Sequence, residues 1–406
     1  MNIFRKLNTH LLGALLCLAL VGIRPAQPFE FKGLRNLVGP GDAVVVSGPD
    51  NRILFSHNTD ALLVPASTLK VLTALTAFHY LGEGYRFQTE FYMDSASNLK
   101  IKGYGDPLLI SEVIADIAAL LYDLLKANGH SLSNIIVDPS YFDRAVVIPG
   151  VTDTAEPYDS PNGALCVNFN TVNFKTINRK YTSAESQTPL LPMTLGHIKK
   201  TGLPQGRITL SHQKDEIVFY AGHLFKYFLE QAGVKVTGKV LLGNVKSADR
   251  RILLFHSPFS LKQGVEKMMT YSNNFMANQI LLEAGISHAG PPGTLQKGVA
   301  AAKKYAKSEL NMDGLQITEG SGISRKNRIT AKHLHKVLLK FKPHFRLLKQ
   351  DGEDFYKTGT LKDVSTRVGF IGRDEANLYA YVILCNTPGK SATLIKTQIE
   401  RLLRLQ

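Results

Sequence analysis

The chain has 406 residues, of which 48 are basic and 33 acidic, so its formal net charge at pH 7 is +15. The composition is that of an ordinary globular protein, and the length allows a main domain with a sizeable second one. A basic excess can suit nucleic acid, an anionic membrane or an acidic polymer. Because no nucleic-acid motif accompanies it, we predict no nucleic-acid partner. Two interpretations stay open: a solvated basic surface, or peripheral contact with an anionic membrane or cell wall.

Residues 1–26 have the pattern of a secretory signal peptide. Arg5 and Lys6 precede an apolar core at residues 11–23, and Ala26 lies near a suitable cleavage point. The apolar core is short for a membrane span. We therefore expect an exported protein, with an uncleaved membrane anchor as the alternative.

Side chains that form disulfides or bind metals are few in the rest of the chain. Cys166 and Cys385 cannot provide a disulfide framework for a domain of this size, and we expect both to be small buried residues. The twelve histidines form no cluster with metal-ligand spacing, and we expect His333 and His335 at the surface. We therefore predict neither a metal site nor another cofactor.

The order of the expected elements suggests a domain that is interrupted by an insertion. Two β-rich runs at residues 43–46 and 53–55 flank a Gly-Pro-Asp-Asn turn and predict a hairpin, which a long apolar helix follows. The pattern changes between residues 96 and 254. We interpret residues 27–95 and 255–406 as one discontinuous domain and residues 96–254 as the insertion.

The insertion is expected to contain two helices, each followed by short strands. Residues 111–127 and 216–231 have the periodicity of amphipathic helices, and β-rich runs follow each of them. Between them, residues 175–215 include a polar stretch with several prolines. This stretch predicts a long loop or a reduced subdomain.

The last third of the chain returns to long helical patterns and ends with strands. Helical periodicity covers most of residues 261–310, and strand-like runs follow at residues 356–361, 366–371 and 378–384. An amphipathic pattern at residues 392–405 predicts a final helix. Helices at both ends of an antiparallel sheet predict an α+β fold.

One short stretch, Pro-Ala-Ser-Thr-Leu-Lys at residues 65–70, carries the candidate chemistry. In the first turn of a helix, Ser67 and Lys70 lie three residues apart and share one face. An unprotonated lysine can take the proton of a serine hydroxyl as the oxygen attacks a carbonyl carbon. Apolar neighbours should lower the pKa of Lys70 by burying it. The helix start also offers backbone N–H groups to a developing negative charge.

Two further motifs can complete this site. Ser272 can relay a proton to a leaving amine, and Asn274 can hold the substrate backbone. The run Lys-Thr-Gly-Thr at residues 357–360 can supply a cation and hydroxyls for a substrate carboxylate, and a backbone N–H for an oxyanion. The candidate site residues are therefore Ser67, Lys70, Ser272, Asn274, Lys357, Thr358, Gly359 and Thr360.

The same short motifs occur elsewhere, so their context has to separate them. Ser211 and Lys214 repeat the serine and lysine spacing, but Asp215 and Glu216 should keep Lys214 solvated, neutralised and protonated. We expect Ser211 to cap a helix instead. A second Lys-Thr-Gly at residues 200–202 runs into a proline, which is unfavourable in a central strand, so we expect a loop there.

In order and spacing, residues 67–70, 272–274 and 357–359 resemble the three motifs of the penicillin-recognising serine enzymes. Gly-Tyr-Gly-Asp-Pro at residues 103–107 and Glu-Gly-Ser-Gly-Ile-Ser-Arg at residues 319–325 are similar to the D-alanyl-D-alanine carboxypeptidase/endopeptidase family, peptidase S13. The resemblance extends over nearly all of the chain after the signal-like segment. The chain departs from the family at its Glu-Gly-Ser-Gly run, where aspartate is commoner than glutamate.

The resemblance implies a β-lactamase/transpeptidase-like core with an antiparallel sheet flanked by helices and an inserted region. It also implies a serine D,D-peptidase of the periplasm, free or membrane-associated, that hydrolyses D-alanyl-D-alanine termini or D-alanyl cross-links of peptidoglycan peptides. Its acyl-enzyme would form on Ser67, and β-lactam inhibitors would bind there covalently. Two alternatives remain open: a β-lactamase or serine esterase on the same fold, and a cell-wall-binding protein without catalysis.

Overall fold

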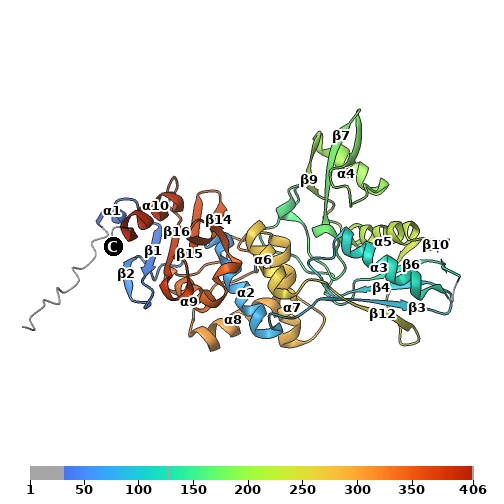
Figure 1. Ribbon diagram of the computed structural model, residues 1–406, viewed down its shortest axis with the longest axis horizontal. Coiled ribbons are helices and arrows are strands. Elements are labelled where there is room, and N and C mark those ends of the chain that lie inside the picture. The colour runs from blue at the N-terminus through green and yellow to red at the C-terminus, as the bar shows by residue number, and fades with distance from the viewer. Residues whose placement is uncertain (1–31, 127–128, 405–406) are drawn as a thin grey trace, which may run out of the picture.

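The computed structural model describes residues 32–126 and 129–404, so the signal-like segment at residues 1–26 lies outside the described residues. Figure 1 shows an elongated molecule with one large sheet near each end and a group of helices between them. None of the helices in the described part of the chain is long and apolar enough to cross a membrane.

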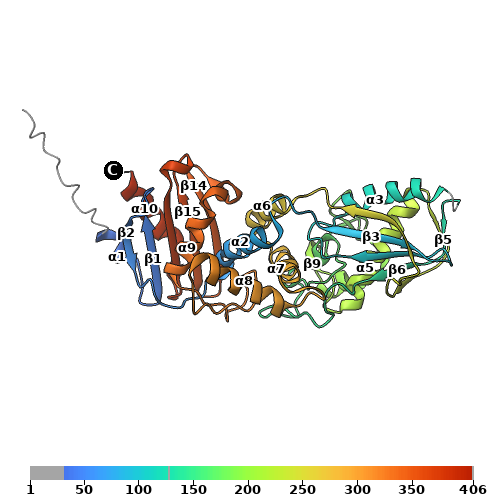
Figure 2. The same cartoon turned by 90° about the horizontal axis from the view of Figure 1, so that it is seen from below.

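The α-helices of the described residues are α1 Lys32–Arg35, α2 Lys70–Leu81, α3 Ser111–Leu124, α4 Leu195–Thr201, α5 Lys214–Gln231, α6 Leu261–Tyr271, α7 Asn274–Ala289, α8 Leu295–Leu310, α9 Ala331–Phe341 and α10 Ala392–Leu403. Figure 2 shows α2 and α7 between the two large sheets. Residues 70–77 of α2 are buried on every side of the helix. A helix that is buried all round belongs to the centre of a protein, and α2 is the element around which the site is built.

A six-stranded antiparallel sheet forms the end of the molecule that contains both the first and the last described elements. Its order is β13-β14-β15-β16-β1-β2. The strands are β1 Asp42–Ser47, β2 Ile53–His57, β13 Lys349–Asp351, β14 Asp354–Leu361, β15 Val364–Ile371 and β16 Tyr379–Cys385. β1 and β2 form the predicted hairpin, and β14, β15 and β16 lie where the last strand-like runs predict them.

Alternate residues of this sheet pack into two different cores. Val44 of β1 lies opposite Ile383 of β16, and both pack with the apolar face of α10. The next pair, Val45 and Val382, belongs to the large core that includes α2 and α9. Since side chains alternate between the faces of a sheet, this pattern buries both faces under helices. The predicted α+β core is confirmed.

The second large sheet has the order β11-β6-β4-β3-β12 and is built mostly from the residues that we interpret as the insertion. Its strands are β3 Gln88–Met93, β4 Leu99–Gly103, β6 Ile135–Asp138, β11 Val240–Leu242 and β12 Arg250–His256. The predicted helices appear as α3 and α5, which lie along this sheet (Figure 1), and two short strands, β5 Ser131–Leu132 and β10 Lys235–Val236, pair beside it. β3 begins before residue 96 and β12 ends after residue 254, so we infer that the insertion runs from β3 to β12.

A small three-stranded sheet projects from the inserted region (Figure 1). It consists of β7 Thr171–Ile177, β8 Lys180–Ser183 and β9 Gln205–Thr209, with α4 beside it. For residues 175–215 we expected either a long loop or a reduced subdomain. The second Lys-Thr-Gly motif lies at the end of α4, where Gly202 has the left-handed conformation with φ +67°. We expected a loop at this motif, and the structure has the last turn of a helix there instead.

Candidate active site

Ser67 lies in a tight turn that leads into α2. The turn is the 3-10 segment η1 Ala66–Leu69, so Ser67 stands just before the α-helix and not in its first turn, where we expected it. Ala66 has a φ of +47°, which is uncommon for a residue with a side chain. The Pro65 carbonyl accepts a hydrogen bond from the Thr366 hydroxyl at 2.8 Å, which ties this turn to β15.

Lys70 is fully buried, and its amine meets three oxygen atoms. Nζ lies 2.9 Å from Ser67 Oγ, 2.8 Å from Asn274 Oδ1 and 2.7 Å from the backbone carbonyl oxygen of Ser321. Carbonyl and amide oxygens can only accept hydrogen bonds. A neutral amine has two N–H groups and one lone pair. When Lys70 is neutral, its two N–H groups are therefore used by Asn274 and Ser321, and its lone pair faces the hydroxyl of Ser67.

The two lysines of the site have lowered pKa values. Burial lowers the pKa of Lys70 well below its usual value, the charge of Lys357 lowers it further, and Glu319 acts in the opposite direction. Burial also lowers the pKa of Lys357, to about 8, with a smaller effect from the charge of Lys349. Both amines lose their proton more readily than a lysine in water, as the apolar neighbours of Lys70 predict.

Ser272 and Asn274 lie at the junction between α6 and α7. Ser272 ends α6 in the left-handed conformation, with φ +53°, and the side chain of Asn273 caps the start of α7. This junction turns Asn274 toward Lys70 and places Ser272 Oγ 2.6 Å from Lys357 Nζ. The described contacts thus join Ser272 to the second lysine, whereas Asn274 contacts the first.

The strand β14 brings the third predicted motif to the nucleophile. Lys357 and Gly359 are buried on one face of the strand, whereas Thr358 and Thr360 are exposed. β13 pairs only with the first residues of β14, so it does not cover the edge that follows. A Cβ atom on Gly359 would lie 2.6 Å from the backbone nitrogen of Ser67. Only glycine lets the strand come this close to the Ser67 amide.

One loop of the site had no assigned role in the sequence analysis. Buried Glu319 accepts hydrogen bonds from the backbone N–H groups of Ser321 at 2.6 Å and of Gly322 at 2.7 Å. This holds the Ser321 carbonyl against Lys70. Gly322 packs against the backbone of Ala66, where there is no room for a Cβ atom. In the sequence, such a loop could be recognised by an acidic residue followed by small residues, because small residues let backbone N–H groups converge on a carboxylate.

The rival serine and lysine pair lies at the start of α5, in the inserted region. Nζ of Lys214 donates hydrogen bonds to the backbone carbonyls of Arg144 and Val146, and burial lowers its pKa. The expectation of a solvated and neutralised Lys214 is therefore wrong. Ser211 is not the cap of α5, which is Gln213, although its hydroxyl accepts the N–H of Gln213 at 3.0 Å.

The histidine and cysteine expectations have different outcomes. His335 lies on the face of α9 that packs against the sheet, is buried, and contacts Ser47 Oγ at 2.8 Å, so its expected surface position is wrong. Burial lowers the pKa of His335 to about 4. Cys166 and Cys385 are both buried, as expected, and neither forms a disulfide. Within residues 32–126 and 129–404, no group of three or more potential metal ligands is found.

Sequence comparisons find relatives over most of the chain. The model of the D-Ala-D-Ala carboxypeptidase 3 (S13) family matches residues 37–350. A D-alanyl-D-alanine carboxypeptidase of Actinomadura sp. (strain R39) is 30% identical over 335 residues, and the match covers 71% of this chain and 62% of that protein. The D-alanyl-D-alanine carboxypeptidase DacB of Haemophilus influenzae is 23% identical over 403 residues, covering 83% of each chain.

The structural comparison agrees with this result. The crystal structure of penicillin binding protein 4 from Haemophilus influenzae has a TM-score of 0.72 at 19% identity, and the match covers 92% of this chain and 98% of that one. The same protein in complex with a β-lactam has a TM-score of 0.68. The family match ends before Lys357, but the contact of this lysine with Ser272 joins the third motif to the other two. The chain belongs to the D-Ala-D-Ala carboxypeptidase 3 (S13) family.

Proposed function

We propose that the protein is an exported serine D,D-peptidase that acts on peptidoglycan peptides in the periplasm. It hydrolyses D-alanyl-D-alanine termini and D-alanyl cross-links through an acyl-enzyme on Ser67. The observation that carries this proposal is the direct contact of Ser67, buried Lys70 and Asn274 in a chain of this family. The signal-like pattern of residues 1–26 supports export.

The first step forms the bond between Ser67 and the substrate. Neutral Lys70 accepts the proton of the Ser67 hydroxyl over the 2.9 Å contact while the oxygen attacks the D-alanyl carbonyl carbon. The backbone N–H of Ser67 and an N–H of β14 stabilise the resulting oxyanion, since Gly359 lets the two backbones approach each other. The substrate carboxylate binds near Lys357, with the hydroxyls of Thr358 and Thr360.

The second step breaks the peptide bond and releases the amine. The leaving nitrogen takes a proton from the Ser272 hydroxyl, and Ser272 recovers the proton that Lys70 accepted from Ser67, so that Lys70 becomes neutral again. Lys357, whose Nζ lies 2.6 Å from Ser272 Oγ, keeps its charge and holds this hydroxyl in place. Asn274 holds the substrate amide in place during this transfer. Water then attacks the ester on Ser67 and releases the acid product. A β-lactam would follow the first step and remain attached to Ser67.

The intact mass of the signal-free protein after incubation with benzylpenicillin tests this proposal. We expect the mass to increase by one penicillin, because the ring carbonyl acylates Ser67. Ser67→Ala should abolish the adduct, whereas Ser211→Ala should leave it unchanged. If wild type forms no adduct and does not consume the antibiotic, the acyl-enzyme proposal is wrong and a wall-binding protein is the better account. Rapid turnover of penicillin without an adduct would indicate a β-lactamase.

A further inference from the structure

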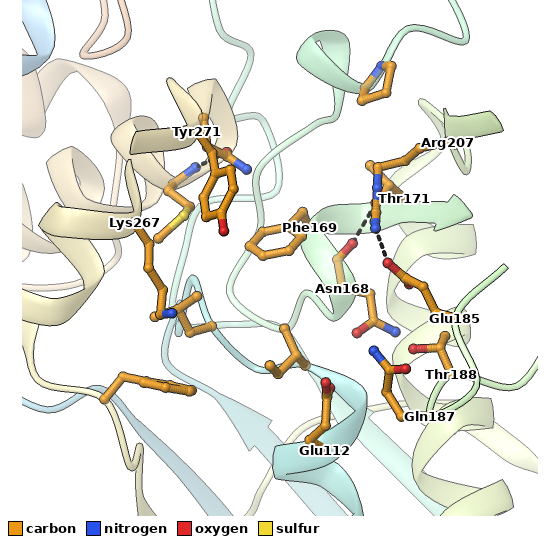
Figure 3. Close-up of a pocket in the computed structure, with 16 residues that line it drawn as sticks. Glu112, Asn168, Phe169, Thr171, Glu185, Gln187, Thr188, Arg207, Lys267 and Tyr271 are labelled. Carbon is orange, nitrogen blue, oxygen red and sulfur yellow. Dashed lines mark hydrogen bonds and ion pairs between the residues drawn. The ribbon is translucent and has the colours of Figure 1, made fainter. Parts of the chain in front are cut away.

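A cavity of about 420 Å³ lies beside the catalytic junction of α6 and α7 (Figure 3). Its volume is within the range of small-molecule sites. Tyr271 and Asn273, the two neighbours of Ser272, line it, whereas Ser67 and Lys70 do not. The cavity is therefore separate from the nucleophile, and its wall includes the two chain neighbours of Ser272, the residue that we propose as the proton donor to the leaving amine.

Charged side chains on opposite walls of the cavity differ in whether they have partners. Arg207 of β9 pairs with Glu185 and donates a hydrogen bond to Thr171 Oγ1 at 2.8 Å, so its charge is compensated. Lys267 of α6 and Glu112 of α3 form no ion pair with any residue that the structure describes. Figure 3 shows both side chains extending along the cavity. Within the part of the chain that the structure describes, no ion pair therefore compensates the charge of Glu112 or of Lys267, whose ammonium lies over the ring of Phe259.

Aromatic side chains also line the cavity. Figure 3 shows the rings of Phe169 and Tyr271 near each other, and the ammonium of Lys267 lies 5.5 Å from the ring centre of Phe259. Tyr271 is 76% exposed, the largest exposed fraction among the large hydrophobic residues of the described chain. An exposed aromatic ring in the wall of a cavity provides contact area for a ligand at little entropic cost.

The position of the cavity identifies the side of the substrate that it can reach. In the proposed reaction, Ser272 protonates the leaving nitrogen, so the leaving part of the substrate begins at Ser272 and extends away from Ser67. A single terminal amino acid ends at the carboxylate held near Thr358 and Thr360. A cross-linked substrate has a whole second peptide on this side, with free carboxylate and amine groups, and that peptide needs a further site.

We propose that this cavity binds the leaving-side peptide of a cross-linked substrate. Lys267 binds a free carboxylate of that peptide, Glu112 binds a free ammonium, and Tyr271 with Phe169 packs against its aliphatic part. The site then favours cross-links over termini, because only a cross-linked substrate can fill it. This inference rests on the proposed D,D-peptidase function and assigns the substrate class for which the cavity selects.

Binding tests the inference without any chemistry. Ser67→Ala protein is titrated calorimetrically with a synthetic dimer of two peptide stems joined through a D-alanyl cross-link, and with the corresponding uncrosslinked pentapeptide. We expect Lys267→Gln and Glu112→Gln, each added to this background, to raise the Kd of the dimer about tenfold relative to that of the pentapeptide, since each removes one charge-assisted hydrogen bond. Lys303→Gln, an exposed lysine of α8 away from the cavity, is the control and should leave the ratio unchanged.

Kinetics on the active protein give the second readout. The ratio of kcat/KM for the dimer to kcat/KM for the pentapeptide should fall about tenfold in Lys267→Gln and stay constant in Lys303→Gln. Equal ratios in wild type and Lys267→Gln, together with equal dimer affinities, would overturn the assignment of the cavity. This outcome is distinct from failure of the proposed function, in which wild type neither forms the penicillin adduct nor hydrolyses either peptide.

Discussion

At the scale of single residues, the two buried lysines need opposite protonation states. Lys70 has to be neutral to accept the Ser67 proton, whereas Lys357 has to be charged to attract a carboxylate. Their separate environments allow this: two oxygens that can only accept hydrogen bonds use the N–H groups of Lys70, while Lys357 donates to the Ser272 hydroxyl at 2.6 Å and to the Thr358 carbonyl at 2.8 Å.

The rate of acylation should therefore depend on pH through both lysines. We expect the second-order rate constant for benzylpenicillin to rise with pH as Lys70 loses its proton, and to fall above about pH 8 as Lys357 loses its charge. This pH dependence is measured from the amount of penicillin adduct formed at a series of quenched reaction times between pH 5 and pH 10. Lys357→Arg keeps its charge at high pH, so the falling limb should disappear in that variant even if its maximal rate is lower. A wild-type rate that stays constant from pH 8 to pH 10 would contradict the role of Lys357.

At the scale of elements, the site depends on how closely β14 approaches the turn before α2. Gly359→Ala adds a Cβ atom that would lie 2.6 Å from the Ser67 nitrogen, so strand and turn must move apart. We expect acylation by benzylpenicillin to slow by about 100-fold, the usual effect of losing one oxyanion donor. The control is Gly84→Ala, because no atom lies within 4 Å of the added Cβ there. Equal acylation rates in Gly359→Ala and wild type would show that acylation does not depend on the close contact between β14 and the turn before α2.

The elements that sequence predicts well are those whose pattern is local. The hairpin at β1 and β2, the helices α3 and α5 and the final strands follow from alternation and helical periodicity alone. The spacing of Ser67 and Lys70 likewise places both on one side of a helix start. The partners of these elements do not follow from local pattern.

The parts of the site that sequence missed depend on contacts between distant segments. The Ser321 carbonyl reaches Lys70 across 251 positions of the chain, and its position depends on the loop around buried Glu319. Lys214 looked solvated beside two acids, yet carbonyls 70 and 68 positions earlier surround its amine. Because such contacts form only when the tertiary structure assembles, neither a motif nor a propensity reports them.

At the scale of the whole molecule, a buried carboxylate joins the catalytic helices to the inserted region. Glu283 of α7 is 4% exposed and accepts hydrogen bonds from the hydroxyls of Tyr85 at 2.7 Å and Tyr141 at 3.2 Å. Tyr85 lies just before β3, where the chain enters the second large sheet, and Tyr141 lies just after β6, one of the strands of that sheet. Only one oxygen of Glu283 has partners among the described residues, and Oε2 is buried without any.

This carboxylate should make stability depend on pH. Burial raises the pKa of Glu283 to about 7, so the folded state binds its proton more tightly than the unfolded chain does. As pH rises from about 4.5 to 7, the free energy of unfolding should therefore fall, by up to about 3 kcal/mol. Urea unfolding at pH 5 and pH 8 measures this: Glu283→Gln should become more stable relative to wild type at the higher pH, whereas Glu266→Gln, an exposed acid on α6, should not. If the difference in unfolding free energy between wild type and Glu283→Gln is the same at both pH values, Glu283 is not protonated in the folded protein. Its contact with the two tyrosines then contains a full negative charge.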